Sequence, residues 1–284
     1  MRSVVITGTS TGIGFATAKV LVANGFRVFG SVRKAADGER LAAELGQNFA
    51  PLIFDVTDRA AVAAAAAQVR SALAGQTLAG LVNNAGVAVP GPLLELPIEE
   101  FRRQIDVNLI GIVMVTQAFA PLLGTDRTLH GGPGRIVNIS SVGGRTAVPF
   151  LGPYNASKFA LEGLSESLRR ELLLFGIDVI VVAPAAVKTA IWGKAKELDM
   201  TPYIDTPYGP ALERLRAYML GLGEKGLPAE RLGQVVLEAL TAKRPKVRYT
   251  ATRQPVQNWL ARHLPKRLLD RLIGGQLGLL RTGE

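Results

Sequence analysis

The chain has 284 residues, of which 48% are hydrophobic and 20% are charged, with a net charge of +10. These values exclude a disordered or collagen-like chain and allow one large α/β domain or two small ones. The sequence has no cysteine and two histidines, His130 and His263, which argues against disulfides, a zinc site and a histidine-based catalytic triad. We expect no metal.

Residues 1–7 form a short β-branched run without the charged start, long apolar centre and cleavage site of a signal peptide. No uninterrupted apolar stretch reaches about 18 residues, the length that a membrane-spanning helix needs. We therefore expect a soluble protein of the cytoplasm.

Apolar runs typical of buried strands alternate along the chain with longer helical patterns. We expect strands at residues 4–7, 28–32, 52–55, 80–83, 135–140 and 177–182, and helices at residues 12–23, 38–45, 59–73, 98–122 and 154–174. Crossovers of this length join parallel strands, and continuous Val, Ile and Leu content fits a sheet covered on both faces. The pattern predicts one doubly wound α/β domain over residues 1 to about 250.

A glycine-rich segment, residues 7–14 with the sequence TGTSTGIG, lies between the first strand and the first helix. Glycines at Gly8, Gly12 and Gly14 let the backbone turn tightly and approach a pyrophosphate at the N-terminus of the helix. The alternative is a tight turn without a ligand, because such a glycine pattern also arises by chance.

Tyr154 and Lys158 stand four residues apart at the start of a predicted helix, so that they share one face. A nearby ammonium favours the phenolate and lowers the pKa of a tyrosine toward the range of a general acid/base. An isolated pair of this kind is more often a surface tyrosine and lysine.

Further polar groups follow other strands. Ser141 comes directly after the strand at 135–140, residues 83–86 (NNAG) follow the fourth strand, and Asn108 lies within an otherwise apolar helical pattern. Each has a structural alternative. Ser141 would be a helix cap or turn residue, Asn83 and Asn84 would be turn formers, and Asn108 would be a core amide with its hydrogen bonds satisfied.

In this order and spacing, these elements resemble the short-chain dehydrogenase/reductase family over residues 1 to about 250. The resemblance implies a Rossmann-type sheet and NAD(P)-dependent hydride transfer between a carbonyl and an alcohol. It makes Tyr154 the acid/base and Ser141 the residue that positions and polarises the substrate oxygen. It also implies that Lys158 binds the nicotinamide ribose and lowers the pKa of Tyr154, and that Asn108 holds a relay water.

The resemblance also implies the cofactor contacts. It places Asp55 and Val56 at the adenine, and it expects a Pro-Gly-x-Val-x-Thr segment at the nicotinamide, where this chain has residues 184–189 (PAAVKT). Ala185 replaces the expected glycine, which leaves open whether that turn needs a positive φ. The cofactor contacts expected are Gly8, Ser10, Thr11, Gly12, Ile13, Gly14, Arg33, Asp55, Val56, Asn83, Ala85, Gly86, Tyr154, Lys158, Pro184, Val187 and Thr189.

The end of the second predicted strand indicates which nicotinamide cofactor binds. An NAD-selective site usually has a carboxylate there for the ribose hydroxyls, but this chain has Arg33 and Lys34, and its first carboxylate is Asp37. The planar guanidinium of Arg33 suits a 2′-phosphate, so we predict NADP(H) in preference to NAD(H). The alternative is that both cations are ordinary solvated charges.

Apolar residues gather in three segments expected to surround the substrate, residues 87–94, 142–151 and 189–219, with a lid at about 188–225. They predict a lipophilic carbonyl or alcohol, and the alternative is packing within the lid. The strand end at 30–33 and the basic, Leu-rich tail resemble the steroid and retinol dehydrogenase branch. A 3-oxoacyl thioester reductase and a non-catalytic NADP-binding sensor remain alternatives. The apolar residues of the three segments expected to surround the substrate include Val148, Phe150, Leu151, Ile191, Trp192, Met200, Tyr203, Tyr208 and Met219.

The last segment, residues 251–284, is expected to be a basic helical extension, with a basic amphipathic pattern over 259–280 that Pro265 and the glycines at 274, 275 and 278 interrupt. The segment predicts either a solvated face or peripheral contact with a membrane, and we expect no nucleic-acid partner. The family resemblance implies a homodimer or homotetramer built through the helices beginning near Ile98 and Tyr154. The physiological substrate, reaction direction and assembly state stay open.

Overall fold

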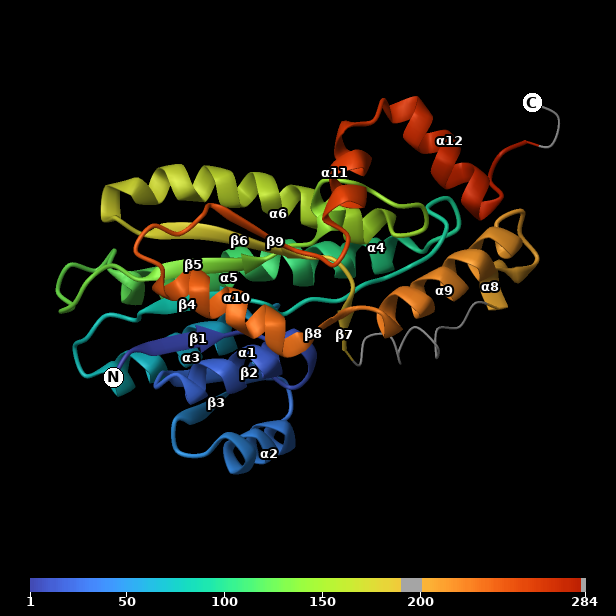
Figure 1. Ribbon diagram of the computed structural model, residues 1–284. Helices are drawn as coiled ribbons and strands as arrows, with labels where there is room; N and C mark the ends of the chain where they lie inside the picture. The colour runs from blue at the N-terminus through green and yellow to red at the C-terminus, as the bar shows by residue number, and fades with distance from the viewer. Residues whose placement is uncertain (190–200, 282–284) are drawn as a thin grey trace.

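The computed structural model describes residues 1–189 and 201–281. Its described part has a central parallel sheet with helices on both faces (Figure 1). The fold is therefore the predicted Rossmann-type doubly wound α/β fold. Seven strands form the sheet in the order β3-β2-β1-β4-β5-β6-β9. Their bounds are β1 (Ser3–Ile6), β2 (Arg27–Val32), β3 (Phe49–Ile53), β4 (Gly80–Asn83), β5 (Arg135–Ile139), β6 (Asp178–Pro184) and β9 (Arg248–Ala251).

The strand order reverses between β1 and β4. From β1 the chain proceeds outward to β2 and β3, and it then returns to place β4 on the other side of β1. At such a point the loops after neighbouring strands diverge and leave a crevice at the carboxyl ends of the strands. The glycine-rich segment and the residues after β4 and β5 all lie at that edge.

Alternation of side chains along β1 explains how the sheet supports two cores. Val4 and Ile6 belong to one buried cluster, together with residues of α1, α2 and α10, while Val5 faces the other cluster, with residues of α3, α5 and α6. Successive side chains of a strand point to opposite faces, so each strand contributes to both. The helices are α1 (Gly12–Ala23), α2 (Ala35–Leu45), α3 (Arg59–Leu73), α5 (Gly111–Phe119), α6 (Gly152–Glu171) and α10 (Ala229–Thr241).

The element boundaries agree with the sequence prediction at α1, α3 and β4, and they differ elsewhere. β3 begins three residues earlier than predicted and contains Pro51, which is tolerated because β3 lies at the edge of the sheet. The α2 helix begins at Ala35. Strand β9 was not predicted, since its four residues, RYTA, carry no apolar run, and its pairing with β6 extends the sheet to Ala251.

The long helix predicted at 98–122 is interrupted in the structure. It consists of α4 (Ile98–Ile105), a π-helical turn at Asp106–Ile110, α5 and a short 3₁₀ turn at Ala120–Leu123. Within the described residues, this run is the one helix long and apolar enough to cross a membrane, by length and composition alone. The sequence analysis predicted no helix that could span a membrane. The core helices of soluble proteins meet the same test, and this run packs against α3 and α6.

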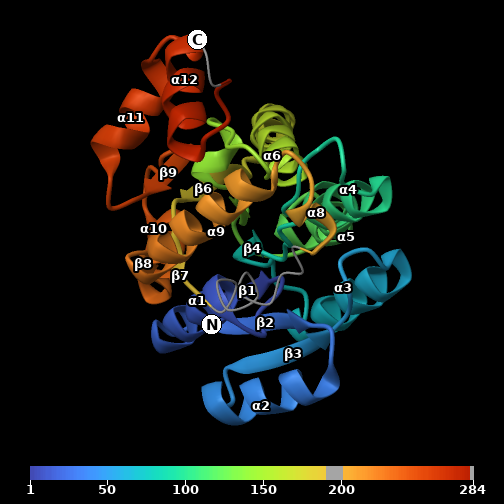
Figure 2. The ribbon, with the colours of Figure 1, turned by 90° about the vertical axis from the view of Figure 1, so that its right-hand side faces the viewer.

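The C-terminal third adds helices beyond the sheet. The short strands β7 (Val187–Lys188) and β8 (Leu227–Pro228) pair with each other, and α8 (Thr201–Ile204) and α9 (Gly209–Glu224) lie between them in the chain. In Figure 2, α9 lies in front of the carboxyl edge of the sheet. Helices α11 (Pro255–His263) and α12 (Lys266–Leu277) project as an arm, and α12 contacts α9. Pro265 separates the two, as predicted, but Gly274 and Gly275 lie inside α12 and do not end it; Gly278 does.

Two helical glycines differ in the space around them: Gly233 of α10 lies against α1, and Gly163 of α6 faces open space. A Cβ at Gly233 would lie 2.8 Å from Val20 Cγ2 and 2.9 Å from the Ala16 carbonyl oxygen, whereas a Cβ at Gly163 of α6 meets nothing within 4 Å. We expect Gly233→Ala to lower the free energy of unfolding by about 1 to 3 kcal/mol. Gly163→Ala should raise it by up to about 1 kcal/mol, because alanine favours helix. Urea denaturation measures both, and a Gly233→Ala variant as stable as wild type would contradict the close packing.

Candidate active site

The glycine-rich turn between β1 and α1 adopts the backbone shape that its glycines allow. Gly8 and Gly12 have φ values of +70° and +63°, in the left-handed region that disfavours other residues. A Cβ at Gly14 would collide with the Gly8 carbonyl oxygen. The turn therefore leaves the N-terminus of α1 open at its edge, with Ser10, Thr11 and Ile13 beside it, in the arrangement that binds a pyrophosphate.

Asn84, which sequence analysis did not include among the site residues, braces this turn. Its Nδ2 donates to the carbonyl oxygens of Thr7 at 2.9 Å and Gly8 at 3.0 Å. The hydroxyl of Thr7 in turn accepts from the backbone N–H groups of Asn84 and Ala85. The loop after β4 and the turn after β1 are thereby held together, with Ala85 and Gly86 at the crevice. The sequence does not reveal this contact, because it forms only once β1 and β4 pair as neighbouring strands.

The end of β2 brings Arg33 near Asp55. Their charged groups are 4.0 Å apart, and both side chains are exposed, Arg33 by 73%. The carboxylate of Asp55 also accepts from the backbone N–H and hydroxyl of Thr57, while Val56 is buried against Gly111. The predicted cation for a 2′-phosphate and the predicted adenine contacts thus lie at one end of the crevice.

Ser141 and Tyr154 meet at the carboxyl end of β5. Ser141 precedes a short 3₁₀ turn at Val142–Gly144, where its Oγ accepts from the Gly143 N–H at 3.0 Å. A Cβ at Gly143 would lie 3.3 Å from Ser141 Oγ and 3.5 Å from Tyr154 Cε1, so the two side chains lie beside each other. Burial raises the pKa of the Tyr154 phenol, and the neighbouring Ser141 side chain lowers it by less. Sequence analysis predicted a lowered pKa. The net shift has the opposite sign here because the loss of water contacts outweighs the other effects.

Lys158 is buried behind Tyr154. Its Nζ lies 5.8 Å from the centroid of the tyrosine ring and donates to the Ile139 carbonyl oxygen at 2.8 Å. Burial lowers the pKa of Lys158 to about 8, and the charge of Glu162 acts in the opposite direction. Glu162 is a second residue that the sequence did not reveal, one helical turn beyond Lys158.

Asn108 occupies the π-helical turn and is completely buried. Its Oδ1 accepts from the Val87 N–H at 2.9 Å, and its Nδ2 donates to the Val87 carbonyl oxygen and to Ser157 Oγ. Gln104 holds the same loop through Val87 and Val89. The amide of Asn108 is therefore fully engaged with protein, and a π-helical turn is often found at a functional site.

Asn83 lies in the core. Its Nδ2 donates to Thr116 Oγ1 at 3.2 Å and to Asn138 Oδ1 at 2.9 Å, and Asn138 donates in turn to Ser165. The side chain joins β4 to α5, β5 and α6 inside the protein.

The segment predicted to contact a nicotinamide, residues 184–189, follows β6. Within the described residues, the positive φ values of residues other than glycine are at Ala74 and Phe150. Ala185 is therefore not in the left-handed region, so its turn does not require glycine, and its N–H donates to the Ala251 carbonyl oxygen at 2.8 Å. A Cβ at Gly12 would lie 3.5 Å from the side chain of Thr189, which places the end of this segment beside the glycine-rich turn.

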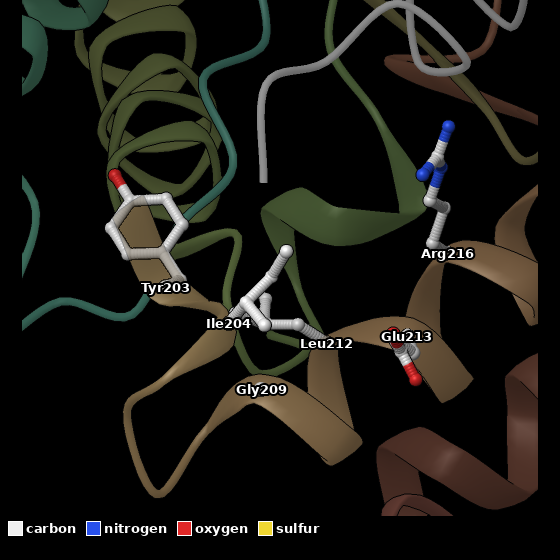
Figure 3. A pocket seen from close by; sticks show the side chains of 6 residues that line it. All are labelled: Tyr203, Ile204, Gly209, Leu212, Glu213 and Arg216. Carbon is white, nitrogen blue, oxygen red and sulfur yellow. The ribbon is translucent and has the colours of Figure 1, made fainter. Parts of the chain in front are cut away.

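The region expected to surround the substrate is partly described. Phe150, with φ of 63°, packs edge-on against Tyr208 at 5.8 Å between ring centroids, and both join Tyr203 in a third buried cluster with residues of α9. Ile191, Trp192 and Met200 lie outside the described residues. A cavity of about 70 Å³ lies between α8 and α9 (Figure 3), too small for a lipophilic substrate and lined by Tyr203, Ile204, Gly209, Leu212, Glu213 and Arg216.

Comparison with known proteins gives the same family at the levels of sequence and fold. The model of the short chain dehydrogenase family matches residues 2–199. An NADPH-dependent 3-dehydrocapnine reductase from Ornithobacterium rhinotracheale is 40% identical over 96% of both chains. Human dehydrogenase/reductase SDR family member 9 is 32% identical over 96% of this chain and 87% of its own. A short-chain dehydrogenase from Streptomyces avermitilis has a TM-score of 0.77, 26% identity, and coverage of 98% and 97%.

The pKa of Lys158 predicts a pH dependence of stability. The folded pKa is about 8 and the ordinary value is 10.5, so the unfolded chain binds this proton more tightly. Burial of Lys158 therefore destabilises the folded state by its full amount below about pH 8, and this destabilisation decreases as the pH rises toward 10.5. Between pH 7 and 10, the unfolding free energy of wild type should therefore rise by about 2 to 3 kcal/mol relative to Lys158→Met.

Urea denaturation at both pH values measures this difference. The exposed Lys243 supplies the control, since Lys243→Met should follow the wild-type profile. Parallel profiles for wild type and Lys158→Met would show that burial leaves the pKa of Lys158 unchanged.

Proposed function

The chain belongs to the short-chain dehydrogenase/reductase family and is an oxidoreductase of carbonyl and alcohol groups, and we propose that it reduces a lipophilic ketone or aldehyde with NADPH. The observation that carries this proposal is the placement of the Ser141 and Tyr154 side chains beside each other at the carboxyl end of β5, with the buried ammonium of Lys158 near the tyrosine ring. Two hydroxyl groups are thereby available to one substrate oxygen.

Several features of the carboxyl edge of the sheet would suit a dinucleotide. The left-handed turns at Gly8 and Gly12 and the absence of a side chain at Gly14 open the backbone to a pyrophosphate. In this proposal Arg33 and Asp55, whose charged groups lie 4.0 Å apart, contact the adenosine end, and Thr189, which lies beside Gly12, contacts the nicotinamide end. When bound, NADPH supplies the hydride. NADPH-dependence is named for the relative from Ornithobacterium rhinotracheale, and we extend it to this chain because Arg33 offers a cation for the 2′-phosphate.

Tyr154 is proposed to protonate the substrate oxygen. Its raised pKa keeps the phenol protonated at neutral pH, which is the form that reduction of a carbonyl requires. Ser141 donates a second hydrogen bond to the same oxygen and polarises it. Lys158 is protonated below its pKa of about 8, and its charge stabilises the phenolate left after proton transfer.

Asn108 is proposed to shape the site through the π-helical turn. Its side-chain amide is already bonded to Val87 and Ser157, so a relay water expected from the family resemblance would have to bind its backbone. Ser157 also donates to the Tyr154 carbonyl oxygen at 2.7 Å, which links the π-helical turn to the helix that carries Tyr154.

The substrate class follows from the apolar lid and from the relatives. We propose that residues 188–225 form a lid, that residues 251–284 form an extension, and that the substrate is lipophilic, as in the steroid and retinol dehydrogenase branch. The third buried cluster, with Phe150, Tyr203 and Tyr208, supports an apolar site wall. The 3-dehydrocapnine named for one relative is the first candidate substrate.

We propose a cytoplasmic homodimer or homotetramer built through α4, α5 and α6. Two apolar side chains on these helical runs are exposed by 45% each, Ile110 and Phe159, and a second copy of the chain would cover them.

The first test replaces the proposed acid. We expect Tyr154→Phe to lower kcat about 10²- to 10⁴-fold, because the proton donor is lost, while the affinity for NADPH stays near that of wild type. NADPH oxidation is followed over a panel of 3-dehydrocapnine, steroid, retinoid, aromatic and 3-oxoacyl thioester carbonyls. Tyr249→Phe is the matched control, since the Tyr249 hydroxyl lies on β9 and accepts from the Lys246 N–H.

The outcomes separate the alternatives. Turnover that persists in Tyr154→Phe would assign the acid to another group. Turnover of the thioesters alone would favour a 3-oxoacyl thioester reductase. Saturable NADPH binding without turnover of any substrate by wild type would favour a cofactor-binding sensor.

The second test addresses cofactor choice. We expect Arg33→Ala to raise KM for NADPH about 10- to 100-fold and to leave KM for NADH unchanged, because the lost bond is to the 2′-phosphate. Arg102→Ala is the control, since Arg102 is 70% exposed and lies 4.0 Å from Glu99, much as Arg33 lies near Asp55. Equal effects on both cofactors would contradict the assignment.

A further inference from the structure

The arm formed by α11 and α12 exposes large apolar side chains. On α11, Val256 and Trp259 are 68% and 59% exposed, and on α12, Leu268 and Leu272 are 44% and 56% exposed. The spacings of three and four residues place each pair on one side of its helix. Leu279 and Leu280 continue the exposed apolar surface after α12. Such a surface on a folded protein usually meets a partner or a membrane.

Cations accompany these apolar residues. Within residues 252–281, one acidic residue, Asp270, stands among six basic residues. All six are exposed, and they are Arg253, Arg262, Lys266, Arg267, Arg271 and Arg281. Exposed apolar residues combined with cations on short helices are typical of segments that lie in the headgroup region of a bilayer.

The base of the arm carries an excess of positive charge. Glu162 accepts from Arg248 at 3.0 Å and from Arg145 at 3.2 Å, so one carboxylate already serves two guanidinium groups. Burial lowers the pKa of Arg262 of α11, and repulsion from the nearby Arg145 and Arg248 lowers it further. An anion outside the protein would relieve this repulsion.

The inner face of α12 is attached to the lid helix α9. Leu277 is buried in the third cluster beside Leu212 and Leu215. Arg214 of α9 donates to the Leu277 carbonyl oxygen at 2.9 Å, and a Cβ at Gly278 would collide with that guanidinium. The arm therefore has one face fixed to the lid helix, while large apolar side chains and cations elsewhere on it are exposed.

We propose that α11 and α12 dock on an anionic membrane surface and hold the lid of the active site at the bilayer. The cations fit acidic headgroups, and the apolar side chains on the same two short helices fit the adjoining acyl region. The purpose of docking, access to a substrate dissolved in the membrane, rests on the proposed function. The docking itself rests on the surface of the arm alone.

The experiment measures binding of the full chain to vesicles without substrate. At low salt the protein should co-sediment with vesicles of equimolar phosphatidylglycerol and phosphatidylcholine. A far smaller fraction of it should co-sediment with vesicles of pure phosphatidylcholine. In a Trp192→Phe background, Trp259 is the single tryptophan, and its emission should shift to the blue as it enters the apolar layer.

Two sets of variants separate charge from apolar insertion. Replacing Arg262, Arg267 and Arg271 with glutamine should weaken partitioning about 100-fold. Leu268→Ser with Leu272→Ser should weaken it at least about tenfold. The matched controls should bind as wild type does, and they are Lys243→Gln with Arg244→Gln for charge and Leu173→Ser with Leu174→Ser for exposed apolar surface.

Specific results would overturn the proposal. They are equal binding to neutral and anionic vesicles, unchanged binding in both arm variants, an unshifted Trp259 emission, or binding to polyglutamate without binding to vesicles. Thermal melts and NADPH affinity show that each variant is folded. Because vesicle binding needs no turnover, failure of docking leaves the reductase proposal standing, and docking without turnover refutes only that proposal.

Discussion

The buried ammonium of Lys158 is the constraint on which the rest of the site depends. A cation in the interior needs a partner, and here the Ile139 carbonyl oxygen at the end of β5 supplies one. Glu162, one turn further along α6, provides the balancing charge. Since both partners must stay in place, the start of α6 is fixed against the carboxyl end of β5, and this fixes Tyr154 beside Ser141.

The same charge balance extends across the domain. Glu162 also accepts from Ser140 Oγ at 2.8 Å, and its ion pairs with Arg145 and Arg248 join the loop after β5 to the last strand of the sheet. The pair with Arg248, in which both side chains are largely buried, is costly to break, since removing one partner leaves the other charge unpaired. A single carboxylate thereby connects α6, the loop after β5 and β9, the strand that precedes the C-terminal arm.

Two parts of the candidate site are held in different ways. The glycine-rich turn, Asn84 and the π-helical turn are held by hydrogen bonds among backbone and side-chain amides. The region proposed to surround the substrate depends instead on aromatic contacts such as Phe150 with Tyr208, and Phe150 is held at a positive φ, which is strained for a bulky residue.

The sequence by itself determined the fold class, most of the strands and the identity of the candidate catalytic groups. Hydrophobic periodicity and the spacing of glycine, serine, tyrosine and lysine are local patterns, so they can be read from a single amino-acid sequence. Only the tertiary structure decided the roles of Asn84 and Glu162, the existence of β9 and the sign of the pKa shift of Tyr154. These depend on which strands become neighbours and on how much water each group loses, and no local pattern encodes either quantity.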